Sequence, residues 1–301
     1  MSSLRLPAIH HRTVETAGVR VFYRETGPAN PDGTDSPTVL LLHGFPSSSH
    51  QYRRLMDALG GDHRLIAPDY PGFGRTVAPD DFVYSFEALT DVVEGFVTAL
   101  DLTSEGRRLV VYAFDFGGPV AFRLAGRHPE WIAGLIIQNA NAYTQGLSDA
   151  ARGLTAEKPG VPGAEDRVRA ILTEDVTRAQ YEGGTTDPSR IAPDGWTLDQ
   201  HYLDLPGRDA TQIALALDYH SNVELYPRWQ RWLAGHRPPT LILWGDGDPF
   251  FTVDGAKAYL RDLPDAQLHI FQTGHFALEE KLPEMAPLIG GFLDSLTVQR
   301  T

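Results

Sequence analysis

The stretch Leu109–Val120, LVVYAFDFGGPV, decides the fold that this sequence predicts. It starts as an apolar run of strand-forming residues, passes through one acidic residue, Asp115, and continues into two glycines and a proline. Small residues around a single polar side chain are typical of a strained turn between a strand and a helix. Proline fits the first turn of the helix that follows. We therefore expect Asp115 to stand at the tip of a buried strand.

Five further apolar runs have the same form and predict more strands, at residues 37–44, 63–70, 132–139, 239–246 and 267–274. Nearly continuous Val, Ile and Leu runs are typical of parallel strands buried on both faces. Amphipathic segments such as Tyr84–Leu100 lie between them, and Thr13–Gly27 predicts an antiparallel hairpin at the sheet edge. Alternating strands and helices indicate the α/β class, with a mostly parallel central sheet flanked by helices.

The alternation stops between about Asn141 and Arg237. This span is rich in Gly, Pro, Asp and Arg, offers helical patterns, and contains no apolar run of the kind that predicts a buried strand. The sequence therefore predicts a core domain over residues 1–140 and 238–301, with an inserted helical cap domain over residues 141–237.

Composition narrows the possible functions. The 301 residues carry a formal net charge of −13, which opposes binding to the phosphates of nucleic acids. Without cysteine there is no disulfide, thiolate nucleophile or cysteine-ligated metal site. The histidines are scattered and no phosphate-binding glycine loop is found, so no cofactor or metal is expected. No signal-peptide pattern or membrane-spanning run is present, which favours a cytoplasmic protein without membrane association. The sequence leaves the choice between a monomer and a homodimer open.

Three polar groups follow predicted strands, where an α/β sheet carries its chemistry. Asp115 follows the strand at 107–114, Asp246 and Asp248 follow the strand at 239–245, and His275 follows the last strand. The chain order of nucleophile, acid and histidine is that of hydrolases with this kind of turn. A lone aspartate there could instead cap the helix, but the flanking glycines and the downstream acid and histidine favour a nucleophile. His269, on the last strand itself, is expected to be a packing or surface residue.

These motifs together resemble the α/β-hydrolases of the epoxide hydrolase and haloalkane dehalogenase branch. HGFP (43–46) matches the HGxP oxyanion motif of that branch, and DYPGFG (69–74) matches its next loop. DFGGP (115–119) is similar to the elbow of bacterial epoxide-hydrolase-like proteins. The resemblance covers nearly the whole chain and implies an α/β-hydrolase fold.

The resemblance implies roles for five residues. Asp115 is expected to attack a saturated carbon and form an alkyl ester, which a carboxylate can do without a base because it is already ionised. His275 would activate water against this ester, oriented by Asp248, which matches the Trp-Gly-x-x-Asp pattern better than Asp246 does. The backbone N–H groups of Phe45 and Phe116 would form the oxyanion hole.

The leaving group separates the activities within this branch. Related epoxide hydrolases polarise the epoxide oxygen with two cap tyrosines, and the resemblance implies Tyr219 as the second of these. Tyr181 is expected to be the first, with Tyr143 and Tyr202 as alternatives, and a packing role stays open for each tyrosine.

A halide would need side-chain N–H donors instead. Phe45 and Phe116 have none, although Trp196, Trp229 or Trp232 could supply one from the cap. We therefore expect an epoxide hydrolase that takes a small hydrophobic substrate, with Phe45, Phe116, Trp196 and Phe250 in the substrate pocket. The alternatives are a haloalkane or haloacid dehalogenase, another hydrolase of C–O or C–C bonds with the same triad, and a non-catalytic ligand-binding protein.

Overall fold

In residues 7–28 and 37–298, which the computed structural model describes, eight strands form one sheet in the order β1-β2-β4-β3-β5-β6-β7-β8. Strands β3 to β8 pair in parallel, whereas β1 and β2 form an antiparallel hairpin and β2 pairs antiparallel with β4. The α/β class is confirmed, and the strands span β1 His10–Thr16, β2 Val19–Thr26, β3 Thr38–Leu42, β4 Leu65–Pro68, β5 Leu109–Phe114, β6 Ile132–Gln138, β7 Thr240–Gly245 and β8 Gln267–Phe271.

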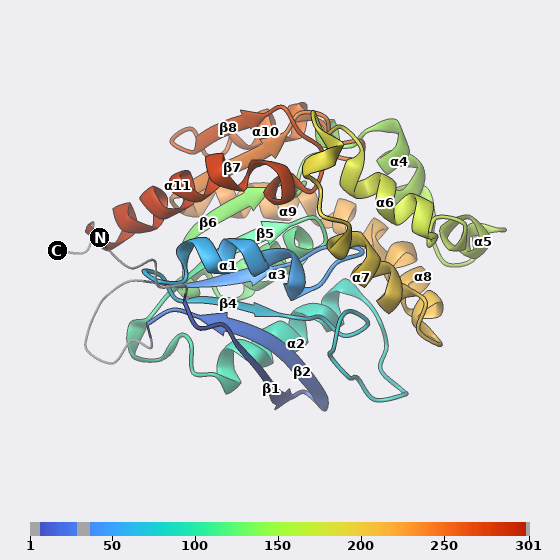
Figure 1. Cartoon of the computed structure of the whole chain (residues 1–301), viewed down its shortest axis with the longest axis horizontal. Coiled ribbons are helices and arrows are strands. Elements are labelled where there is room, and N and C mark those ends of the chain that lie inside the picture. The colour runs from blue at the N-terminus through green and yellow to red at the C-terminus, as the bar shows by residue number, and fades with distance from the viewer. Residues whose placement is uncertain (1–6, 29–36, 299–301) are drawn as a thin grey trace.

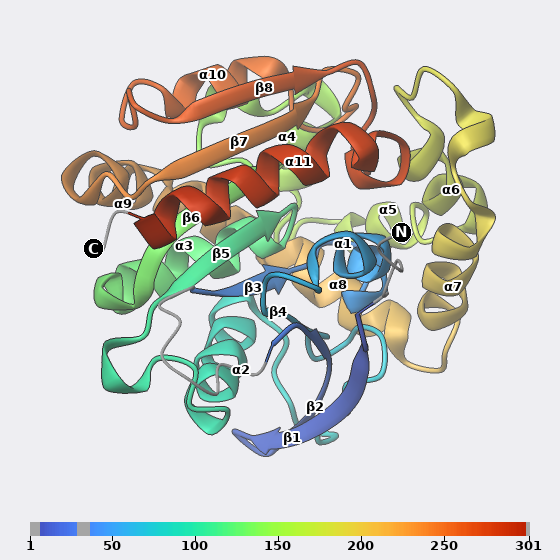
Figure 2. The same ribbon diagram turned by 60° about the vertical axis from the view of Figure 1, so that its left-hand side comes forward.

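Helices cover both faces of the sheet (Figure 2). Side chains alternate along a strand, so Val110 and Tyr112 of β5 pack on one side and Val111 and Ala113 on the other. The first side is covered by α1 and α11, and the second by α2, α3 and α10. These helices span α1 Arg53–Leu59, α2 Phe86–Ala99, α3 Gly117–Arg127, α10 Val253–Tyr259 and α11 Ala277–Val298.

Residues 267–274 were predicted to form a buried strand; the strand is present, but the prediction that it is buried was wrong. Gln267 is exposed and Ile270 is 41% exposed, although β8 lies where the sequence placed it. The physical reason is that β8 is the last strand of the sheet and pairs only with β7. An apolar run alone does not distinguish an edge strand from a central one.

The span between β6 and β7 is helical and contains no named strand among its residues, all of which the structure describes. Helices α4 to α8 gather at one end of the molecule, on the right of Figure 1. Helix α9 returns along α3, where the Trp229 ring lies 5.4 Å from that of Phe122. The bounds are α4 Asp149–Ala156, α5 Ala164–Arg169, α6 Glu174–Glu182, α7 Pro193–Leu203, α8 Arg208–Asp218 and α9 His220–His236.

The described residues contain neither a membrane-spanning helix nor a grouped set of metal-binding side chains. Each helix in residues 7–28 and 37–298 falls short of the length or apolar character needed to cross a bilayer. In the same residues, no three His, Asp or Glu side chains are grouped so that they could hold a metal ion.

Candidate active site

Asp115 occupies a sharp turn between β5 and α3. Its φ of 47° lies in the left-handed region that non-glycine residues rarely adopt, which is strain of the kind found at functional sites. Glycines make the turn sterically possible. A Cβ on Gly44 would lie 2.3 Å from the Asp115 Cβ, and one on Gly117 would lie 2.1 Å from the carbonyl oxygen of Leu42. The turn thus presses the Asp115 side chain against the loop that follows β3.

That loop directs a backbone donor at the carboxylate. The N–H of Phe45 donates a hydrogen bond to Asp115 Oδ1 at 2.7 Å. His43 fixes the loop from below, because the N–H of Tyr70 donates to its Nε2 (3.1 Å) and its Nδ1 lies 3.1 Å from the Gly44 carbonyl. The proton must therefore be on Nδ1, and burial lowers the pKa of His43 to about 4, which keeps the ring neutral.

His275 lies between two carboxylates. Its Nδ1 is 2.7 Å from Asp248 Oδ2, and its Nε2 is 3.6 Å from Asp115 Oδ2. Burial opposes the charged ring, but attraction to Asp248 and the hydrogen bonds with Asp115 and Asp248 outweigh it and raise the pKa of His275 to about 10. The imidazole is therefore protonated at neutral pH.

Asn139 is a residue of the site that the sequence reasoning missed. It follows β6, and its Nδ2 donates to Asp248 Oδ2 at 2.7 Å, while its Oδ1 accepts from the N–H of Gly245. The other Asp248 oxygen accepts from the N–H groups of Phe250 (2.7 Å) and Phe251 (3.1 Å). The available signal was position, because Asn139 ends the strand next to the one that delivers the acid. These donors orient the Asp248 carboxylate toward His275.

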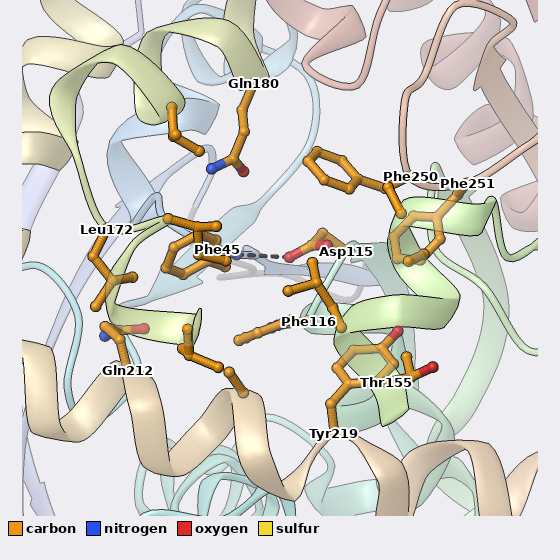
Figure 3. A pocket seen from close by; sticks show the side chains of 17 residues that line it. Phe45, Asp115, Phe116, Thr155, Leu172, Gln180, Gln212, Tyr219, Phe250 and Phe251 are labelled. Atoms are coloured by element: carbon orange, nitrogen blue, oxygen red, sulfur yellow. Dashed lines mark hydrogen bonds between the residues drawn. The ribbon is translucent and has the colours of Figure 1, made fainter. Parts of the chain in front are cut away.

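A cavity of about 290 Å³ lies over Asp115 (Figure 3). Four aromatic side chains of the core line it beside Asp115, and they are Phe45, Phe116, Phe250 and Phe251. The insertion contributes mainly apolar side chains, including Ala151, Leu154, Val168, Ile171, Leu172 and Val176. Among the described residues that line the cavity, none is Lys, Arg or His. The cavity therefore suits an uncharged, largely apolar molecule.

Tyr219 brings a hydroxyl to this cavity. The side chain is 7% exposed, and its ring lies 5.8 Å from that of Phe116 and 5.6 Å from that of Phe86. Burial, followed by the nearby Tyr226 phenol, raises its pKa well above the usual value of 10, so the hydroxyl keeps its proton. This hydroxyl is buried and makes no hydrogen bond of ordinary geometry within the described part of the chain.

Tyr181 and Trp196 are not among the residues that line the cavity. The Tyr181 hydroxyl donates to Asp199 Oδ2 at 2.5 Å, and its ring stacks on Phe276 with 3.8 Å between centroids. The Trp196 ring instead lies 5.6 Å from the guanidinium carbon of Arg178. The other tyrosine and tryptophan candidates, Tyr143, Tyr202, Trp229 and Trp232, also lie outside the cavity lining.

Gln180 lies in the cavity in place of its neighbour Tyr181. It is 5% exposed, and Figure 3 shows its amide directed inward from α6, across the cavity from Tyr219. Successive residues of a helix point about 100° apart, so only one of the two can face Asp115. The helical pattern of TRAQYEGG did not show which one.

Asp199 is a fully buried acid within the insertion. It accepts the Tyr181 hydroxyl, and its Oδ1 has no partner among the described residues. Burial raises its pKa from about 3.8 to about 7, with a smaller contribution from Glu279, while Tyr181, Ser47 and Arg53 act in the opposite direction. Asp199 is therefore largely protonated below neutral pH.

Asp199→Asn should stabilise the protein more at pH 8 than at pH 5. Between pH 4 and 7 the unfolded chain releases a proton that folded Asp199 retains, so the wild type loses stability as pH rises through this window. Asparagine keeps an acceptor for Tyr181 and never carries charge. We expect a Tm about 5 °C higher for the variant at pH 8 by differential scanning calorimetry. An equal Tm difference at both pH values would contradict this assignment.

The fold and the family comparison agree on a class. The chain belongs to the alpha/beta hydrolase fold family, whose model matches residues 37–282. It is 36% identical over 288 residues to the uncharacterized hydrolase YNR064C of Saccharomyces cerevisiae. The aligned region covers 92% of this chain and 94% of that protein.

More distant similarities extend to proteins of two activities. Epoxide hydrolase 2 of Caenorhabditis elegans is 23% identical, with 92% of this chain and 77% of that protein covered. The crystal structure of haloalkane dehalogenase DbeA from Bradyrhizobium elkani has the same fold, with a TM-score of 0.76, 22% identity and coverage of 97% and 99%. The protein is thus a hydrolase of the α/β-hydrolase fold.

Proposed function

We propose that this protein hydrolyses an apolar epoxide to a vicinal diol through an ester on Asp115. The observation that carries the proposal is the protonated Tyr219 hydroxyl, which lies in the same cavity as the Asp115 carboxylate and has the Tyr226 phenol as a neighbour. Opening an epoxide needs an anionic nucleophile and an acidic O–H donor on the ring oxygen. The cavity supplies both, and its apolar walls exclude water from the first step.

In the first step, an Asp115 oxygen attacks an epoxide carbon and the C–O bond of the ring breaks. The released oxygen takes the proton of Tyr219, which leaves a hydroxyalkyl ester and a phenolate. Esterification removes the negative charge of Asp115, and the pKa of His275 falls because one of its two carboxylate partners is lost. His275 can then return a proton to Tyr219 and become a neutral base.

In the second step, His275 takes a proton from water, and the hydroxide adds to the ester carbonyl. The oxyanion would accept hydrogen bonds from the N–H groups of Phe45 and Phe116, each worth about 3 kcal/mol. The diol oxygen leaves with the proton of His275, and the carboxylic acid on Asp115 then reprotonates His275. The resting charges are restored, and epoxide and water have become diol.

Dehalogenation is a second candidate function, and one observation favours it. Gln180 brings an amide N–H into the cavity, and N–H donors suit a departing halide. An amide cannot hand over a proton to an alkoxide, whereas Tyr219 can, so the phenol favours the epoxide. Incubation with matched epoxides and haloalkanes, followed by measurement of diol and free halide, decides between the two.

Tyr219→Phe tests the proposed acid. We expect kcat/KM for epoxides to fall about 100-fold, because a buried donor to the developing alkoxide is removed while the ring packing stays. The matched control is Tyr143→Phe, which removes a phenol hydroxyl bound to Asp262 outside the cavity. Unchanged epoxide turnover by Tyr219→Phe would sink the role of Tyr219.

A further inference from the structure

Gln212 of α8 lines the far side of the cavity and is only 2% exposed. Its Nε2 donates to the carbonyl oxygen of Gly72 at 2.9 Å. A carbonyl can only accept, so the nitrogen of the Gln212 amide must face Gly72. This bond fixes the orientation of the amide and determines where its oxygen points.

The oxygen of this amide has no partner. Gln212 Oε1 is buried and accepts no hydrogen bond from the described residues. Figure 3 shows this oxygen on the side of the amide that faces the cavity and the nitrogen on the opposite side. A buried acceptor without a donor destabilises a protein, and leucine would fill the same wall without this cost. The arrangement is therefore explained by a donor on the bound molecule.

The position of Gln212 separates it from the reacting groups. In the view of Figure 3, Gln212 and Leu172 lie at one end of the cavity, Phe250 and Phe251 lie at the other, and Asp115 lies between them. A donor bound to Gln212 is thus a second polar group of the substrate. A charged ammonium would lose its hydration in these apolar walls, whereas a hydroxyl needs one acceptor and carries no charge.

We propose that the substrate is an apolar hydroxy-epoxide whose hydroxyl, separated from the ring by apolar carbons, donates to Gln212 Oε1. This inference rests on the proposed function and adds the chemical class of its substrate. Gln212 then acts as a specificity-determining residue, while Asp115 and Tyr219 act on the ring.

The test uses terminal epoxides that differ in the number of methylenes between ring and hydroxyl, each paired with its methyl ether. For the best-fitting chain length, we expect kcat/KM of the wild type to be at least about tenfold higher for the alcohol than for the ether. Gln212→Leu should remove this preference or reverse it. A general loss of structure would lower kcat/KM for the alcohol and the ether by the same factor and leave their ratio unchanged.

Gln230→Leu is the matched control. The Gln230 amide also donates to a backbone carbonyl, that of Ala142, but lies outside the cavity, so the wild-type ratio should persist. Equal turnover of alcohol and ether by the wild type at every chain length would overturn the inference and leave the proposed function intact.

A binding measurement separates the two proposals. Thermal shift with a long-chain alcohol and its isomeric ether needs no catalysis. If the alcohol raises the Tm of the wild type more than the ether does, and Gln212→Leu abolishes this difference, the Gln212 site is supported. If no epoxide is hydrolysed in the same case, only the proposed function is refuted. If the alcohol and the ether shift the Tm equally, in the wild type as in Gln212→Leu, the Gln212 site is refuted.

Discussion

Asp115→Asn should reduce epoxide hydrolysis at least about a thousandfold, because it replaces the only carboxylate in the described cavity lining with an amide that cannot attack carbon. Asparagine tolerates the left-handed backbone of this turn, so the fold should survive. Diol formation by gas chromatography gives the rate, and intact-protein mass spectrometry shows whether an adduct forms. We expect neither diol nor adduct.

Asp246→Asn is the matched control, since it removes an exposed carboxylate two residues from Asp248. Its activity should equal that of the wild type. Suppose that Asp115→Asn still turns over substantially and that its products contain no oxygen from the enzyme. Water would then attack the substrate directly, and the ester mechanism would be refuted.

His275→Gln should trap the ester. The first step needs only Asp115 and an acid on the ring oxygen, whereas the second needs a base to deprotonate water. Loss of a general base slows that step by roughly 10²–10⁴-fold. Mixing the variant with an epoxide should therefore shift the protein mass by the mass of the epoxide, and digestion should locate the adduct on Asp115.

The control is His269→Gln, which alters a half-buried histidine of β8 outside the cavity. It should turn over normally and accumulate no adduct. If His275→Gln instead showed full turnover, or no adduct with substrates that the wild type hydrolyses, the role of His275 as the base would be refuted.

The sequence predicted the sheet well because each buried strand is a short apolar run followed by a turn. The same reasoning located Asp115, Asp248 and His275, since parallel strands bring their carboxyl ends to one edge. In the structure these three side chains do meet, at 2.7 and 3.6 Å from the His275 ring nitrogens. Order along the chain was enough to group them.

The insertion was less predictable, because helix packing depends on contacts that no local pattern records. Deciding whether Tyr181 or Gln180 faces the cavity requires the rotation of α6 about its axis to be known to within one residue, and Gln180 is the one that lines it. The donors around Asp248 and the free oxygen of Gln212 depend on side-chain orientation, which a sequence does not contain. Amide residues such as Asn139 also give no distinctive signal, because most glutamines and asparagines in proteins lie at the surface.

The two sources of the cavity wall have an evolutionary consequence. Asp115, Phe45 and Phe250 lie at the carboxyl edge of the sheet, whereas Leu154, Leu172 and most other lining residues belong to the insertion. Mutations in the insertion away from Tyr219 can therefore change which molecules fit without disturbing Asp115, Asp248 or His275. A combinatorial library confined to α4, α6 and α8 would therefore select for new substrates while the reaction stays the same. Sequence divergence in the insertion can change the substrate range in the same way.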